Sequence, residues 1–205
     1  MSEEKRCPIC RDERVPTENW GRISEGPQWV VVYKCPRCGR FAITLLHSRR
    51  VEDISNEERR KVTAYLRERN FQEQEGKLIV VGFGDHPEGL KPGAIWVTWE
   101  DAVAAFPQTP AERLDRTLLN LSRLSVHLGS PIGIDAFSEP LAFAENNEEM
   151  WFIFKQLIDD ELLKPYGSEI ARLVVTVKGW SRVAWIQSLI APEEKAPIGF
   201  HPDTK

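Results

Sequence analysis

The sequence predicts an α+β fold with a β-rich N-terminal part and a second part that is mainly helical. Three observations support this prediction: two cysteine pairs with equal spacing, a β-branched stretch beside the second pair, and capped helical patterns around a hairpin further along the chain. Together these patterns predict a zinc ribbon followed by a winged-helix domain. The expected segments are a ribbon over residues 1–50, a connector with one helix and a short strand over 51–97, a winged helix over 98–190 and a flexible tail over 191–205.

The ribbon is predicted from the four cysteines of the chain, which are Cys7, Cys10, Cys35 and Cys38. Two residues between thiols allow a tight turn that directs both sulfurs at one ion, and four thiolates suit tetrahedral zinc. Since four protein ligands leave no open coordination position, we expect a structural Zn²⁺ whose binding energy is largely the folding energy of the ribbon. Two unrelated reduced pairs are the alternative. A redox pair is disfavoured because no βαβ pattern surrounds either motif.

Strands and one helix are expected through the ribbon and the connector. QWVVVYKC at 28–35 and GRFAITLL at 39–46 read as two strands on either side of the second cysteine pair. Ser55 and Glu58 form a capping box that predicts a helix, with most of its arginines outside the buried side. KLIVVGFG at 77–84 predicts a further strand, and the glycine- and proline-containing DHPEGLKPG that follows predicts a loop at the domain boundary.

Capped helices and a hairpin predict the winged helix. Thr98 caps a short helix, and Thr109 with Pro110 and Glu112 caps a longer one. The next helix is expected from Asn147 to about Leu163. The residues expected to face the core are Trp151, Phe154, Leu157 and Leu162.

The remaining pattern completes the prediction of the second part. LLKPYGSEIARLVVTVKGW at 162–180 is predicted as a hairpin with its turn near Gly167, and SRVAWIQSLI at 181–190 as a closing helix. Helices followed by a hairpin and another helix are typical of a winged helix. A small α+β domain without a wing is the alternative.

Charge separates the two halves of the chain. Residues 1–71 hold 15 Lys and Arg against 11 Asp and Glu, whereas residues 72–205 hold 12 against 20. The helix expected near 147–164 has a net charge of −3, which disfavours its insertion into a DNA groove. We therefore expect any nucleic-acid contact on the ribbon, through Arg37, Arg40, Arg49 and Arg50.

Aromatic residues of the same half could stack on bases, and the candidates are Trp20, Trp29 and Phe41. The alternative is that these aromatics form the small core of the ribbon and that the arginines are only solvated.

Other patterns bound the function. No apolar run approaches the length of about 18 residues that a membrane span needs, and the N-terminus MSEEKRCPIC is not a secretory signal. We therefore expect a cytoplasmic protein with reduced cysteines and no membrane partner. None of the four histidines lies in a metal motif or beside a recognisable nucleophile, and the phosphate-binding pattern GxxxxGK is absent. We expect no enzyme activity.

The order of these motifs resembles the N-terminal region of a bacterial family, over residues 5–190. The motifs are CPIC, YKCPRCGRFAIT, a basic helix, TPAERLDRTLLNLSRLS and LIDDELLKP with VTVKGWSRV. In that family a zinc ribbon and winged-helix region precedes a nucleoside deoxyribosyltransferase-like or TIR-like catalytic domain, in anti-phage defence effectors that include retron systems. The family's catalytic domain would begin near residue 197, whereas this sequence ends at Lys205, so its nucleotide-cleaving activity is not carried over.

The sequence thus predicts a non-catalytic, zinc-binding recognition module whose partner is a protein or a nucleic acid, in anti-phage defence as the resemblance implies. A DNA-binding transcription regulator is one alternative, and the regulatory half of a nucleotide- or NAD-cleaving effector is another. The acidic helix near 147–164 favours the first hypothesis over the second, because it opposes a phosphate backbone.

Overall fold

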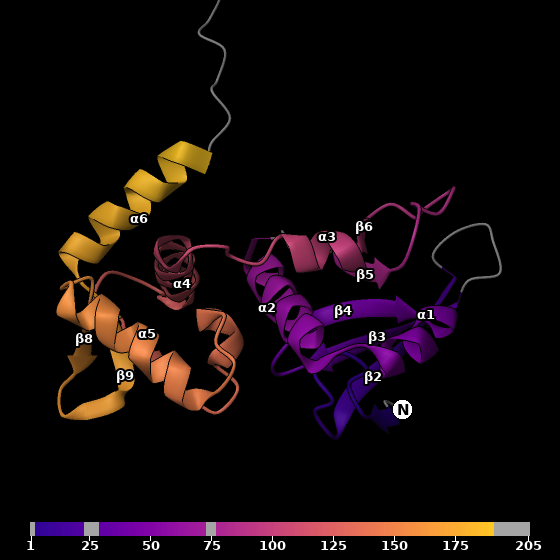
Figure 1. The fold of residues 1–205 in the computed structure, drawn as a ribbon, viewed down its shortest axis with the longest axis horizontal. Coiled ribbons are helices and arrows are strands. Elements are labelled where there is room, and N and C mark those ends of the chain that lie inside the picture. The colour runs from indigo at the N-terminus through magenta and orange to yellow at the C-terminus, as the bar shows by residue number, and fades with distance from the viewer. Residues whose placement is uncertain (1–2, 23–28, 73–76, 191–205) are drawn as a thin grey trace, which may run out of the picture.

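The computed structural model of the chain describes residues 3–22, 29–72 and 77–190. Its elements gather into two lobes that lie next to each other (Figure 1). Residues 3–104 form a lobe around a six-stranded sheet, and residues 110–190 form a lobe of helices around a three-stranded sheet. The chain is therefore a mixed α+β protein, as predicted, with its cysteine cluster in the N-terminal lobe.

The strands of the six-stranded sheet lie in chain order. They are β1 (Glu3–Lys5), β2 (Val15–Arg22), β3 (Trp29–Cys35), β4 (Gly39–Thr44), β5 (Leu78–Gly82) and β6 (Ala94–Thr98). The pairs from β1 to β4 are antiparallel, whereas β4–β5 and β5–β6 are parallel. The sheet therefore continues from β3 and β4, which flank the second cysteine turn, into β5 and β6 of the expected connector, across the boundary placed at residue 50.

Helices cover one face of this sheet. They are α1 (Leu45–Arg50), the 3-10 turn η1 (Val51–Asp53), α2 (Asn56–Gln72) and α3 (Trp99–Ala104). The capping box at the start of α2 is confirmed, since the Glu58 amide donates to Ser55 Oγ at 3.2 Å and Ser55 Oγ donates to the Glu58 carboxylate at 3.0 Å. Buried side chains of α2, α3 and the strands form one continuous core, which also contains the cysteines.

The apolar stretch 39–46 differs from its prediction as a single strand. β4 ends at Thr44, and α1 begins at the next residue. The Thr44 Oγ1 accepts a hydrogen bond from the His47 amide at 3.2 Å, as an N-cap residue does. The hydroxyl group thereby ends the strand and begins a short helix. β1, β2 and β6 were not predicted from the sequence at all.

The second lobe combines three helices with an antiparallel sheet in the order β7–β9–β8. Its elements are α4 (Pro110–Leu124), β7 (Ile132–Gly133), the 3-10 turn η2 (Glu139–Ala142), α5 (Asn147–Asp159), β8 (Leu163–Tyr166), β9 (Glu169–Val175) and α6 (Val177–Ile190). The predicted hairpin is confirmed, because β8 and β9 pair around Gly167, whose φ is +62°. The predicted cap of α4 is also present, with the Glu112 amide 3.1 Å from Thr109 Oγ1.

The core-facing side of α5 is as predicted, although the helix is shorter. Phe154 and Leu157 are buried, and Trp151 and Leu162 pack partly buried against the same core. The helix ends at Asp159 rather than near Leu163, and Glu161 then takes a positive φ of 61° that turns the chain toward β8.

The last helix begins earlier than predicted, at Val177 instead of residue 181. The Thr176 hydroxyl accepts a hydrogen bond from the Gly179 amide at 3.0 Å and caps the helix. A Cβ on Gly179 would lie 2.2 Å from the Leu162 carbonyl oxygen, so glycine is needed where the start of α6 packs against the turn between α5 and β8. The segment VTVKGW therefore leaves the hairpin as a helix. The tail expected over 191–205 lies outside the described residues.

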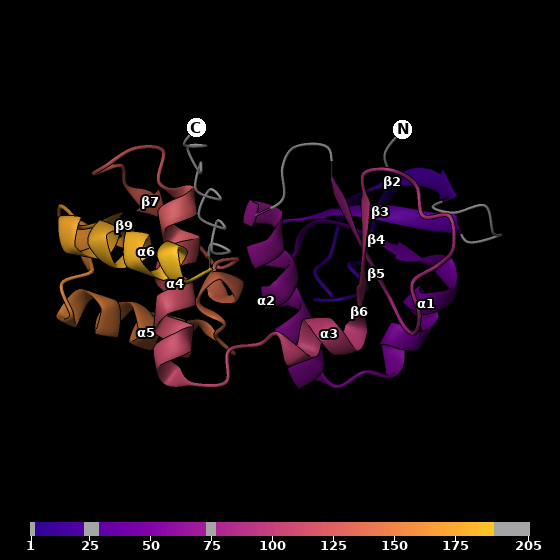
Figure 2. The same cartoon turned by 90° about the horizontal axis from the view of Figure 1, so that it is seen from above.

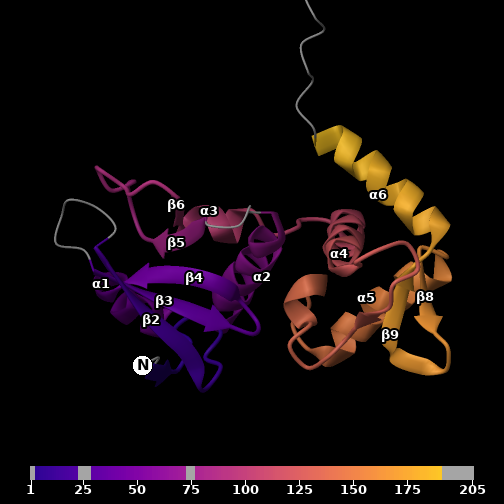
Figure 3. The ribbon, with the colours of Figure 1, turned by 180° about the vertical axis from the view of Figure 1, so that it is seen from behind.

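The two lobes are joined by packing between α2 and the second lobe, and Figures 2 and 3 show α2 beside α4 and the η2 segment. Phe106 and Phe143 meet edge to face with ring centres 5.7 Å apart, and both pack with Ala64 in a buried cluster. Glu68 on α2 is buried and forms an ion pair with Arg116 on α4. The lobes are therefore held together by apolar and ionic contacts as well as by the chain that links them.

Candidate metal centre and basic surface

The four cysteines come together at one end of the six-stranded sheet. Cys7 and Cys10 lie in the turn between β1 and β2, and Cys35 and Cys38 lie in the turn between β3 and β4. The four sulfur atoms all lie within 4.8 Å of one another. The Cys7–Cys38 sulfur distance is 3.8 Å and the Cys10–Cys35 distance is 3.4 Å. The predicted tetrad is therefore assembled closely enough to hold a single metal ion.

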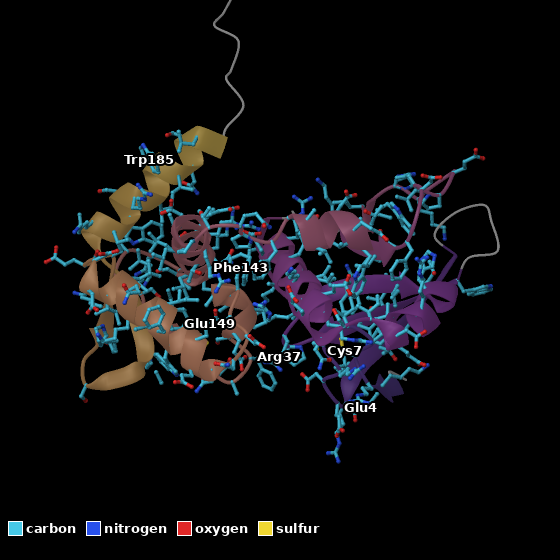
Figure 4. All side chains as sticks on the ribbon, in the orientation of Figure 1. Glu4, Cys7, Arg37, Phe143, Glu149 and Trp185 are labelled. Carbon is cyan, nitrogen blue, oxygen red and sulfur yellow. The ribbon has the colours of Figure 1, made fainter. Side chains whose placement is uncertain are left out.

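The sulfur cluster is enclosed by protein. Cys7, Cys35 and Cys38 are buried and Cys10 is partly buried (Figure 4 shows Cys7 inside the first lobe). Burial raises the pKa of the Cys7 and Cys38 thiols, while hydrogen bonds from the neighbouring cysteines lower the pKa of Cys35. Without a cation, the cluster thus resists carrying four negative charges. A thiophilic divalent ion would supply the charge that four thiolates need.

The second cysteine turn is fastened to α2 through Asn70. The Asn70 side chain donates to the Cys38 carbonyl at 3.2 Å and accepts from the Arg40 amide at 2.8 Å. Gly39 allows this approach, because its φ is +82° and a Cβ there would lie 2.5 Å from Asn70 Cγ. The glycine after the second pair therefore serves both the turn and the docking of the helix.

The first cysteine turn is fastened to α2 through Arg59. Its guanidinium donates to the carbonyls of Pro8 at 2.6 Å, Ile9 at 3.1 Å and Ile54 at 3.1 Å, and also to the Val51 carbonyl. Burial lowers the pKa of Arg59, and the nearby charge of Arg11 acts in the same direction. The expectation that the arginines of α2 lie outside its buried side is wrong for this residue, which is only 4% exposed. The many carbonyl acceptors explain why a charged side chain can be buried here.

The arginines expected to bind nucleic acid have different surroundings. Arg37 lies between the lobes (Figure 4) and forms an ion pair with Glu139 of η2 at 2.8 Å. Arg40 is half-buried on β4, and the Arg50 guanidinium lies 4.3 Å from the centre of the Phe83 ring. The side chain of Arg49 lies outside the described part of the structure, although its backbone belongs to α1. Nucleic-acid contact by these residues stays a prediction.

The aromatic candidates also differ from one another. Phe41 is completely buried and stacks on Tyr33 with ring centres 5.3 Å apart, so it belongs to the core and cannot stack on a base. Trp29 is 45% exposed. The side chain of Trp20 lies outside what the structure describes.

Few other polar clusters suggest chemistry. Within the described ranges, the cysteine tetrad is the only group of histidines, cysteines and carboxylates placed to hold a metal ion. Asp85 and His86 are exposed in the loop after β5. His47 Nδ1 accepts a hydrogen bond from the Phe83 amide at 3.4 Å, and burial, followed by the charge of Arg50, lowers its pKa.

Across the described part of the chain, no helix combines the length and the apolar character needed to cross a membrane. No family model, curated protein or solved structure matches the chain.

Proposed function

We propose that the chain is a non-catalytic recognition module, held together by a structural zinc ion, whose first lobe contacts nucleic acid and whose second lobe holds a protein partner. The observation that carries this proposal is the enclosed cysteine tetrad within residues 1–71, the stretch of the chain that has a net positive charge. Four sulfur ligands leave no coordination position for a substrate, so the ion would serve folding rather than chemistry.

Zinc fits the donor set and its spacing. Cys7, Cys10, Cys35 and Cys38 would hold the ion, and zinc bound to four thiolates has metal–sulfur distances of about 2.3 Å. In a regular tetrahedron, those distances place the sulfurs about 3.8 Å apart. The Cys7–Cys38 distance of 3.8 Å agrees with that value, and the Cys10–Cys35 distance of 3.4 Å needs only a small expansion.

Charge supports assigning nucleic acid to the cysteine-bearing part of the first lobe rather than to the whole lobe, since residues 72–104 hold 2 Lys and Arg against 6 Asp and Glu. Residues 1–71 carry a net positive charge, with 15 basic against 11 acidic residues. Each arginine that neutralises a phosphate releases counterions, and a basic surface is needed to supply this term. The exposed side of α5 includes Glu148 and Asp159, which would repel a phosphate backbone.

The topology of the second lobe supports a winged-helix assignment. Its sheet has the order β7–β9–β8, with the β8–β9 hairpin directly after α5 in the position of a wing. A groove of 570 Å³ lies between the start of α4 and α5, and Phe152 lines it with 61% of its surface exposed. The charged pair in this groove, Arg113 and Glu149, is internally neutralised at 2.5 Å. A largely apolar lining whose charged pair is neutralised suits a protein partner more than nucleic acid.

A duplex-DNA regulator is the second candidate, favoured by basic residues on the β8–β9 hairpin. Lys164 is exposed on β8, and the Arg172 guanidinium lies 5.1 Å from the centre of the Tyr166 ring. A wing can contact a DNA backbone with such residues. The resemblance to defence effectors adds the proposal that the partner belongs to an anti-phage system.

The test is a titration of single- and double-stranded DNA and RNA at several salt concentrations. Replacing Arg49 and Arg50 by Glu should weaken binding and flatten its salt dependence. The matched pair Lys155→Glu and Lys164→Glu on the second lobe should have little effect. If the second pair abolishes binding and the first is silent, the chain is a duplex-DNA reader. If the wild type binds no nucleic acid at low salt, the module binds protein only.

A further inference from the structure

The first cysteine turn borders a hollow of 340 Å³ that is lined mainly by polar side chains. Three arginines line it, and only one carboxylate does. The side chains that matter are Arg6, Arg11, Arg59, Tyr33, Ser48 and Glu52. None of these residues was among the arginines that the sequence indicated for nucleic-acid contact. The hollow is therefore a separate feature of residues 1–71, the basic part of the first lobe.

The backbone of the cysteine turn places two of these arginines at the hollow. Arg11 has a φ of 64°, and its amide donates to the Cys7 carbonyl at 3.0 Å, which closes the turn. Arg6 Nε donates to the Arg11 carbonyl at 3.1 Å. Both side chains are exposed. A folded turn therefore brings both arginines to the same hollow, with the Arg6 side chain held against the backbone of Arg11.

Arg6 and Arg11 are not needed to neutralise the negative charge of the metal centre. A divalent ion with four thiolates carries roughly two net negative charges. Arg59 contacts the first cysteine turn, and Arg67 is near enough to Cys35 and Cys38 to interact with their charge. These two arginines of α2 can balance the centre. Glu52 is then the one carboxylate that lines the hollow with Arg6 and Arg11, and the hollow keeps a positive excess.

A neighbouring hollow shows the contrast. It has a volume of 200 Å³, lies between the lobes, and its charged lining residues are Arg11, Arg37, Arg59 and Arg60 together with Glu139 and Glu145. Arg37 is paired with Glu139 there, and Arg60 donates to the Phe143 carbonyl at 3.3 Å. Arg37 and Arg60 therefore already have acceptors in the protein, while Arg11 and Arg59 border both hollows. The hollow at Arg6 and Arg11 is the better place for an external anion.

We propose that this hollow binds a phosphate group of nucleic acid, with Arg6 and Arg11 donating to the phosphate oxygens. This proposal rests on the proposed function. It names the place, within the basic residues 1–71 of the first lobe, where nucleic acid would be held. Guanidinium forks match the geometry of phosphate oxygens, and charge-assisted bonds of this kind are among the strongest polar contacts in proteins. The volume exceeds what one phosphate fills, so the attached sugar has room as well.

The test compares two neighbouring arginines in the metal-loaded protein. Arg11 and Arg14 are both exposed and both have a positive φ, at 64° and 59°, but only Arg11 lines the hollow. Arg11→Gln should weaken binding of a single-stranded oligonucleotide about tenfold and lower the salt slope by about 0.7. Arg14→Gln should change the affinity less than about threefold, since it removes only a screened charge.

Two further arms keep the result decisive. Arg6→Gln, whose backbone needs no special conformation, should act like Arg11→Gln, and zinc content verifies that each variant is folded. The oligonucleotide is used with a 5′-phosphate and with a 5′-hydroxyl. Loss of affinity for both forms assigns a backbone phosphate, and loss confined to the phosphorylated form assigns a terminal phosphate. If Arg11→Gln and Arg6→Gln both match Arg14→Gln, the proposal is overturned.

The proposal and the proposed function can fail separately. If the wild type binds no oligonucleotide, nucleic acid is wrong as a partner, and inorganic phosphate becomes the probe. Broadening of its ³¹P resonance by the wild type and by Arg14→Gln, but not by Arg11→Gln, then supports a site for free phosphate compounds. Absence of broadening with the wild type overturns the site.

Discussion

Arg59 and Pro8 are 51 residues apart in the chain, and the Arg59 guanidinium donates to the Pro8 carbonyl at 2.6 Å. The same guanidinium bonds to the carbonyls of Ile9, Ile54 and Val51. One buried side chain thus joins the first cysteine turn to η1 and α2. The geometry of the metal ligands and the position of the longest helix are therefore mechanically linked.

Replacing Arg59 by Met should destabilise the protein by more than about 3 kcal/mol, because several buried carbonyls lose their donor at once. Zinc affinity should fall as well, since the turn that holds Cys7 and Cys10 loses its anchor. Chemical denaturation and competition with a chelator measure the two effects. Lys61→Met is the control, because Lys61 makes only an exposed ion pair with Glu57 and a long contact of 5.9 Å to the Phe106 ring centre, and its loss should cost less than about 1 kcal/mol. Equal effects of the two variants would contradict the role of Arg59.

The contact between the lobes makes a second prediction. Phe143 is completely buried against Phe106, so Phe143→Ala should cost about 3–5 kcal/mol. Phe152→Ala, on the same lobe but 61% exposed, should cost less than about 1 kcal/mol. Denaturation followed by tryptophan fluorescence and by circular dichroism measures both. If Phe143→Ala unfolds at the same denaturant concentration as the wild type, the lobes do not stabilise each other through this cluster.

Two glycines of the second lobe offer a matched pair. Gly179→Ala should destabilise the protein by about 1–3 kcal/mol, because its Cβ would approach the Leu162 carbonyl oxygen to 2.2 Å. Gly133→Ala has no atom within 4 Å of its added Cβ and should be nearly neutral. Thermal unfolding compares them. If Gly179→Ala leaves the thermal stability unchanged, the start of α6 does not pack against the turn that contains Leu162.

His47 predicts a pH dependence. Burial first, and the charge of Arg50 second, lower its pKa, so the unfolded chain binds a proton more readily than the folded one. The contribution of neutral His47 to stability is therefore complete above pH of about 7. It falls as the pH drops below about 6.5, the usual value for histidine, toward the lower folded pKa. Unfolding of the wild type and of His47→Gln between pH 5 and 8, at saturating zinc, isolates the effect. A constant difference between them across this range would contradict the prediction.

The sequence predicted elements whose signals are local. Capping at Ser55 and Thr109, the hairpin at Gly167 and the spacing of the cysteines depend on a few adjacent residues, and each of these features is present. The start of α6 was missed because valine and threonine favour strands, whereas the Thr176 hydroxyl caps a helix. The strand β6 was missed because it follows a loop rich in glycine and proline and is specified by its pairing with β5.

Some residues of the candidate site could likewise be predicted from local sequence signals, and others could not. The four ligands follow from their spacing, but Arg59 was expected outside the core because a charged residue is normally exposed. Its burial depends on four carbonyls, and two of them, those of Pro8 and Ile9, lie in a segment that meets α2 only after folding. Arg6 and Arg11 gave no separate signal in the sequence either. Their proximity depends on the positive φ of Arg11 and on its bond to Cys7, which a linear pattern does not reveal.

The metal content of the purified protein tests the central claim most directly. Protein prepared without chelators should contain one zinc ion per chain by elemental analysis, and Cys35→Ser should reduce that content sharply, because three thiolates and a hydroxyl hold zinc less tightly. The absence of any bound metal in folded wild-type protein would contradict the account.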